Sequence, residues 1–174
     1  MTIKVFLTPA PVPLLDSQAQ SLIAWIPNAM VNELQQDRDE QLQHVLENVR
    51  QRGGQCLPTP WTPHDGHGHA IPLQWSEDTP PHRLDRDCQP LNPTNIGLEA
   101  GAMVRLAMQQ KPYLQPDGMG CGTVLRLIGI QYCSTELIPR EPCFEAVAEL
   151  FRQSSSNGSP GELLLRSQFV ASFL

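Results

Sequence analysis

Apolar residues recur at intervals of three and four between residues 28 and 52, with charged residues between them. This spacing places the apolar side chains on one face of an α-helix and the charged ones on the other. Gly53 and Gly54 follow and suit a left-handed C-terminal cap. The pattern therefore predicts an amphipathic helix from Asn28 to Arg52. Its apolar positions are Val31, Leu34, Leu42, Val45, Leu46 and Val49.

Residues 123–133 are almost continuously apolar, which is typical of a strand covered on both faces. We therefore predict a central strand near 123–133. Arg126 interrupts the apolar run. Its guanidinium must either reach solvent near the strand end or pair with a carboxylate, because an unpaired buried charge is costly.

Weaker patterns predict one more strand and three more helices. The strand is short, from Ile3 to Leu7, and prolines follow it at once. Each helix begins at a residue that can cap it or with a proline in its first turn. The helices are expected over residues 16–26, 95–110 and 141–153.

Prolines dominate residues 55–93, where they remove backbone donors and exclude a long helix. We expect an extended, irregular excursion draped over the core, with Ala70 to Trp75 as an edge strand. Residues 154–161 are rich in serine and glycine and predict a flexible loop.

Together these elements predict a single α+β domain that spans residues 1–174. In this fold class a small sheet around the central strand near 123–133 is packed by three to four helices. The long proline-rich irregular segment, residues 55–93, lies outside that framework.

The chain has 174 residues and a net charge of −6, which argues against broad attraction to nucleic-acid backbones. No apolar run is long enough to span a bilayer. The five cysteines are an odd number and form no Cys-x-x-Cys pair, which favours free thiols in a reducing compartment. We therefore expect a cytoplasmic protein that does not bind membranes.

Two segments contain residue types that could carry chemistry. His64, His67 and His69 lie among glycines, and their imidazoles suit a divalent metal, although the spacing matches no metal motif and a solvated surface loop is the alternative. Cys121 lies between glycines at 118–122, as a nucleophile or simply within a tight turn. No catalytic motif is present, so we lean towards a protein that is not an enzyme and needs no cofactor other than that metal.

Several residues have the composition of protein interfaces, in which tryptophan and arginine serve as anchors. In addition, the C-terminal segment 162–174 is too apolar to be left in water and must dock either on this domain or on a partner. The interface candidates are Trp61, Trp75, Arg83, Arg86, Phe169 and Phe173.

These observations lead to a non-enzymatic accessory or adaptor subunit of a larger protein assembly. It would bind through the proline-rich excursion, the apolar tail or both. One alternative is an accessory subunit of a ribonucleoprotein, such as an RNA-guided defence complex, in which RNA binding occurs only within the complex. The other is a small metal-binding protein or metal-dependent enzyme that uses the loop from His64 to His69.

Overall fold

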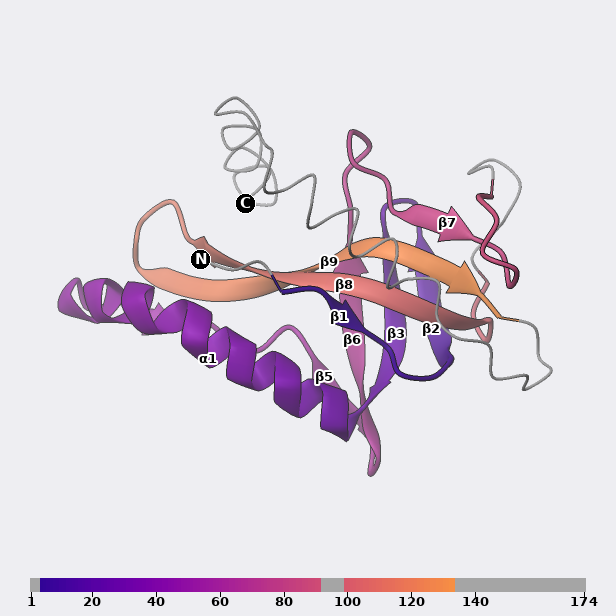
Figure 1. Cartoon of the computed structure of the whole chain (residues 1–174). Coiled ribbons are helices and arrows are strands. Elements are labelled where there is room, and N and C mark those ends of the chain that lie inside the picture. Colours follow the sequence, from indigo (N-terminus) through magenta and orange to yellow (C-terminus); the bar gives the residue numbers. More distant parts are fainter. Residues whose placement is uncertain (1–3, 92–98, 134–174) are drawn as a thin grey trace.

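The computed structural model describes residues 4–91 and 99–133, and within these ranges the chain is mostly β-structure with one helix. Figure 1 shows how these elements are arranged. In chain order they are β1 (Phe6–Leu7), β2 (Val12–Gln18), β3 (Ser21–Pro27), α1 (Asn28–Gln51), β4 (Gln55–Cys56), β5 (Thr62–Asp65), β6 (Gly68–Gln74), β7 (His82–Leu84), β8 (Met103–Leu114) and β9 (Gly120–Tyr132).

Five of the strands form a closed ring. β8 pairs with β2, β2 with β3, β3 with β6, and β6 with β9, and the pairing of β9 with β8 closes the circle. The β6–β9 pair is parallel and the other four pairs are antiparallel. The short strands also pair with ring strands: β1 with β8, β5 with β6, and both β4 and β7 with β9. The structure is therefore a small barrel with added edge strands.

The barrel interior is filled by alternate residues of each strand, because side chains of a strand point to opposite faces. In β3, Leu22, Ala24 and Ile26 are buried, whereas the residues between them are partly exposed. The same alternation in β6 buries Ile71 and Leu73. These residues join the main core, so the remaining residues of β3 and β6 form an outer face.

Helix α1 runs alongside the long β8–β9 ribbon, which extends beyond the rest of the barrel (Figure 1). Its first half packs Met30, Val31 and Leu34 into the main core. Its second half packs Leu42 and Val49 into a separate cluster that includes Cys121 of β9. The helix predicted from Asn28 to Arg52 is thus confirmed, because its apolar stripe matches the surface that it covers.

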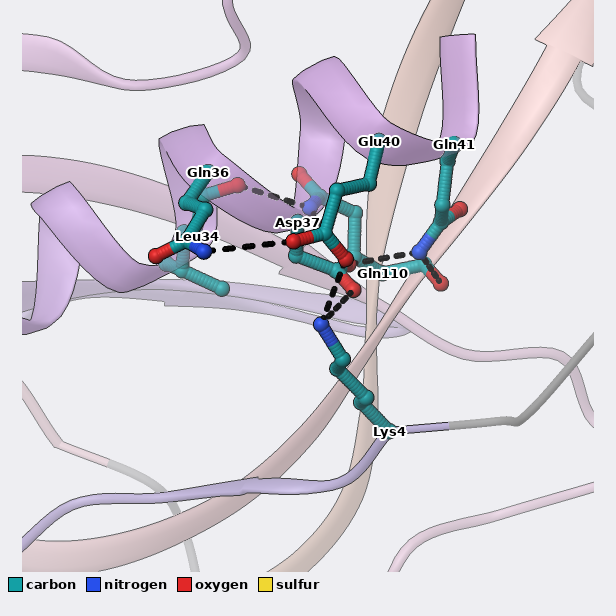
Figure 2. A network of polar contacts seen from close by, with 7 residues as sticks. All are labelled: Lys4, Leu34, Gln36, Asp37, Glu40, Gln41 and Gln110. Carbon is teal, nitrogen blue, oxygen red and sulfur yellow. Dashed lines mark hydrogen bonds and ion pairs between the residues drawn. The ribbon is translucent and has the colours of Figure 1, made fainter. Parts of the chain in front are cut away.

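Polar side chains between α1 and the ribbon form a connected network (Figure 2). Gln110 of β8 donates from Nε2 to the Leu34 carbonyl and to Asp37 Oδ2, both at 2.9 Å. Lys4 Nζ lies 3.4 Å from Asp37 Oδ1 and 2.8 Å from Glu40 Oε2. Because Asp37 is only 3% exposed, these partners satisfy a carboxylate that would otherwise be costly to bury.

Arg38 lies next to this network and is also only 3% exposed. Its Nη1 donates to Thr123 Oγ1 of β9 at 2.8 Å, and its Nη2 donates to the carbonyl of Leu57 and to Cys56 Sγ. The guanidinium therefore connects α1, β9 and the chain that follows β4. Such a fork of donors can bind several acceptors at once, which a lysine cannot do in the same geometry.

The α+β fold class with three to four packed helices is wrong, because the described chain is mainly a β-barrel with one helix. Residues 16–26 form parts of β2 and β3 instead of a helix. In β3 every second residue is buried, namely Leu22, Ala24 and Ile26. The helix expected over 95–110 is wrong over residues 103–110, which belong to β8. Long-range pairing with β9 decides that segment, because its apolar residues suit either a buried strand or a helix.

The segment from 55 to 93 is also more regular than its prolines suggest, since it contains β4, β5, β6 and β7. The strand expected from Ala70 to Trp75 is present as β6, but its placement at a sheet edge is wrong, because β6 has β3 on one side and β5 and β9 on the other. The predicted strand near 123–133 is present as β9 and pairs on both sides. The expected helix at 141–153, the loop at 154–161 and the apolar tail lie outside the described residues.

Candidate functional site

The outer face of β3 and β6 carries a compact group of partly exposed side chains. The register pairs Trp25 with Ala70, Ile23 with Pro72, and Ser21 with Gln74. All six are neither fully buried nor fully exposed, since they point away from the barrel interior. We call these six residues the β3–β6 face.

Trp25 is held against the sheet by two neighbours. Its indole lies directly over Gly68, where an added Cβ would come within 2.3 Å of Trp25 Cε2. Its Nε1 donates to Asp65 Oδ2 at 2.9 Å. The absence of a side chain at Gly68 therefore lets the ring settle on the strand, and Asp65 fixes its direction.

Asp65 is itself fixed by the turn between β5 and β6. Its Oδ1 accepts the backbone N–H groups of His67 at 2.8 Å and Gly68 at 2.7 Å. The His67 N–H, with smaller contributions from Trp25 and Gly68, holds the pKa of the Asp65 carboxyl below its ordinary value. The carboxylate is therefore ionised at neutral pH and orients Trp25.

A shallow cleft of about 110 Å³ adjoins the β3–β6 face at the turn between β2 and β3. Its apolar side chains come from Ile23 and Pro72, and Leu22, whose side chain is buried in the core, also borders it. Hydrogen-bonding side chains complete the lining, and none of the lining residues is cationic. These polar residues are Asp16, Ser17, Gln18, Ser21 and Gln74.

Cationic and aromatic residues continue the surface across β9 and β8. Gln74 of β6 pairs with the partly exposed Arg126 of β9, which is opposite Gln109 of β8, a buried residue. Lys111 lies two residues further along β8, on the same side of that strand as Gln109. Beyond it, Tyr113 packs on Gly122, where a Cβ would be 3.0 Å from the ring. Arg126 is partly buried and sits in the middle of its strand on the outer side of the barrel, so it does not disturb the core.

The structure separates most of the predicted interface residues from this surface. Trp61 and Trp75 belong to the main core and are only 6% and 4% exposed. Arg83 lies in β7, and Arg86 lies in the following turn, where its Nε is 3.7 Å from Asp87 Oδ2. Phe169 and Phe173 lie outside the described residues.

The histidine loop forms the hairpin between β5 and β6. His69 Nδ1 lies 3.0 Å from Asn28 Oδ1, whereas His64 and His67 are exposed. In the described parts of the chain, no group of three His, Cys, Asp or Glu side chains is arranged to hold a metal ion. Cys121 is fully buried, and burial raises the pKa of its thiol, which does not suit a nucleophile.

No protein-family model matches this sequence, and no curated protein sequence matches it. Solved structures do match its fold. The single-stranded DNA-binding protein gp2.5 of bacteriophage T7 is similar with a TM-score of 0.61 at 11% identity, covering 81% of this chain and 100% of that one. A C-terminally truncated single-stranded DNA-binding protein of bacteriophage Enc34 is similar with a TM-score of 0.50 at 15% identity, covering 76% of this chain and 86% of that one.

The ring order of the five strands agrees with these similarities. Counted along the chain, the ring strands are β2, β3, β6, β8 and β9, and the first pairs with the second and the fourth. The fold is an OB-like barrel. In this numbering β3 and β6 are strands two and three, whose outer face binds oligonucleotides in OB-folds. Trp25 and its neighbours therefore lie on the face that corresponds to strands two and three of an OB-fold.

The comparisons overturn the prediction of a non-enzymatic adaptor or accessory subunit, because the similar solved structures reported above are single-stranded DNA-binding proteins. The two alternatives, a ribonucleoprotein accessory subunit and a histidine-loop metal protein, are wrong together with that prediction. Among the residues described, no helix is long and apolar enough to cross a membrane.

Sequence reasoning missed Trp25 and Asp65 as site residues. The segment that contains Trp25 was expected to be helical, which hides the outward row of Ser21, Ile23 and Trp25. No clear signal in the sequence could have found it, because residues 22–26 are continuously apolar and only their burial alternates in the structure. Asp65 gave no signal either, because only the hairpin register brings it to the indole.

Proposed function

We propose that this protein binds single-stranded DNA on the β3–β6 face of its OB-like barrel. The observation that carries the proposal is Trp25, a partly exposed indole held in place by Gly68 and Asp65 on the strand pair that OB-folds use for oligonucleotides. Aromatic platforms of this kind stack on bases of any sequence. The two similar phage proteins, both single-stranded DNA-binding proteins, support the same choice of ligand.

In this proposal one base stacks on Trp25, and its neighbour contacts the apolar pair formed by Ile23 and Pro72. Arg126 and Lys111, further across the same surface, contact phosphates. The net charge of −6 means that few phosphates are neutralised, so stacking contributes a large share of the affinity. Each phosphate contact steepens the dependence of log K on log salt by about 0.7 for a single strand.

The decisive experiment measures the fluorescence anisotropy of a labelled thymidine oligonucleotide titrated with the full chain. Replacement Trp25→Ala is expected to weaken binding about fivefold or more, because stacking on an aromatic side chain contributes about 1–3 kcal/mol per base. Trp25→Phe should retain most of the affinity, since it keeps a ring. His44→Ala, which removes an exposed ring from α1, is the matched control and should change nothing.

Two results would contradict the proposal. The first is a wild-type chain that does not bind the oligonucleotide even at low salt. The second is a folded Trp25→Ala variant with wild-type affinity, which would remove the β3–β6 face from the binding surface. In a companion titration, Arg126→Gln should reduce the salt slope by about 0.7, whereas Arg50→Gln on the exposed side of α1 should leave it unchanged.

A further inference from the structure

The cleft at the turn between β2 and β3 differs in chemistry from the rest of the surface. Its lining holds one carboxylate, two hydroxyls, two amides and three apolar residues, with no arginine or lysine. We propose that this cleft is a base-reading subsite that prefers bases with an exocyclic amino group, such as cytosine, over uracil or thymine. The inference rests on the proposed function and names the part of the ligand that this site recognises.

The cleft is placed to receive the base that follows the one stacked on Trp25. Ile23 lines the cleft and lies two residues from Trp25 on the same face of β3. Two residues of a strand span about 6.6 Å, so a base on Trp25 and a base in the cleft are neighbours in position. Pro72, the cross-strand partner of Ile23, completes an apolar floor for the ring.

The polar side of the cleft favours a hydrogen-bond donor. Asp16 Oδ1 accepts the backbone N–H of Ser17 at 2.8 Å, which fixes the direction of the carboxylate. Within the described part of the chain, Asp16 Oδ2 takes part in no hydrogen bond and remains able to accept one. The N4 amino group of cytosine donates to a carboxylate, whereas O4 of uracil or thymine is an acceptor that a carboxylate repels. A phosphate would be repelled for the same reason, so the base edge and not the backbone suits this site.

The test compares oligonucleotides of deoxycytidine and deoxyuridine of equal length, because these bases share one ring and differ only at C4 and in the hydrogen that uracil carries on N3. At neutral pH and fixed salt, the wild-type chain is expected to bind the deoxycytidine strand about fivefold more tightly. Asp16→Asn should abolish that preference, because its amide can donate to O4 as well as accept from N4. Asp39→Asn removes the same charge from the exposed side of α1 and should retain the preference.

The outcomes separate this inference from the proposed function. Equal affinity for the two strands, together with weaker binding by Trp25→Ala, overturns the subsite and leaves the β3–β6 face as the binding surface. A cytidine preference that survives Asp16→Asn also overturns the subsite. If neither oligonucleotide binds to the wild-type chain, both the proposed function and the subsite are overturned.

Discussion

Polar groups are buried on one side of the barrel and accessible to solvent on the other. Asp37, Arg38 and Gln110 are buried between α1 and the β8–β9 ribbon. Gln110 donates to Asp37, and Arg38 donates to Thr123 of β9. Trp25 on the β3–β6 face and its partner Asp65 in β5 remain accessible to solvent. The first group stabilises the fold and the second is available to a ligand. The comparison predicts that substitutions on the first side change stability, whereas those on the second change binding.

The largest effect is expected for Arg38→Ala. This change removes the donors to Thr123 Oγ1 and to the Leu57 carbonyl and leaves both acceptors between packed elements. Because unsatisfied buried polar groups are costly, the free energy of unfolding should fall by about 3 kcal/mol, as measured by urea denaturation.

Arg50→Ala is the matched control for that substitution, since Arg50 is exposed near the end of the same helix. Its effect should stay within about 0.5 kcal/mol. DNA binding by the folded Arg38→Ala fraction should equal that of the wild type. A loss of affinity per folded molecule would show that the two sides of the barrel are not independent.

An intermediate effect is expected for Gly68→Ala, which acts on the outer side. The added Cβ would lie 2.3 Å from Trp25 Cε2, so the indole must move off the strand and lose its hydrogen bond to Asp65. We expect a severalfold loss of oligonucleotide affinity and a loss of about 1 kcal/mol in stability, measured by anisotropy and urea denaturation.

Gly66→Ala tests whether that loss comes from the indole. Gly66 lies in the same hairpin, but its added Cβ would meet no atom within 4 Å. This variant should bind and unfold like the wild type. If the two alanine variants lose the same affinity and stability, the effect comes from the hairpin backbone and not from Trp25.

The smallest effect concerns pH. Because the pKa of Asp65 is lowered in the folded protein, its support for Trp25 is complete above the ordinary aspartate pKa of about 3.9. That support is lost as the pH falls through the lowered value. The indole N–H resonance of Trp25 in NMR spectra should therefore be constant near neutrality and shift only in acid. Asp65→Asn should abolish the acid shift, and a wild-type shift near neutral pH would contradict this assignment.

Sequence reasoning located α1 and β9 because each pattern agrees with the final environment. The stripe of α1 faces one surface, and the apolar run of β9 is paired on both sides. Sequence reasoning placed Trp61 and Trp75 among the interface residues, because composition alone does not distinguish a core tryptophan from an exposed one. The core location of both follows from how β5, β6 and their neighbours close the barrel.

By itself the sequence determined the local elements whose periodicity has one interpretation, above all the helix from Asn28 to Gln51. The tertiary structure decided whether residues 16–26 and 103–110 are helix or strand, because their apolar residues satisfy both periods until partners are fixed. It also assembled the candidate site. Trp25, Asp65 and Gly68 meet only because β3, β5 and β6 pair in one register, and long-range pairing of that kind leaves no mark on the local pattern.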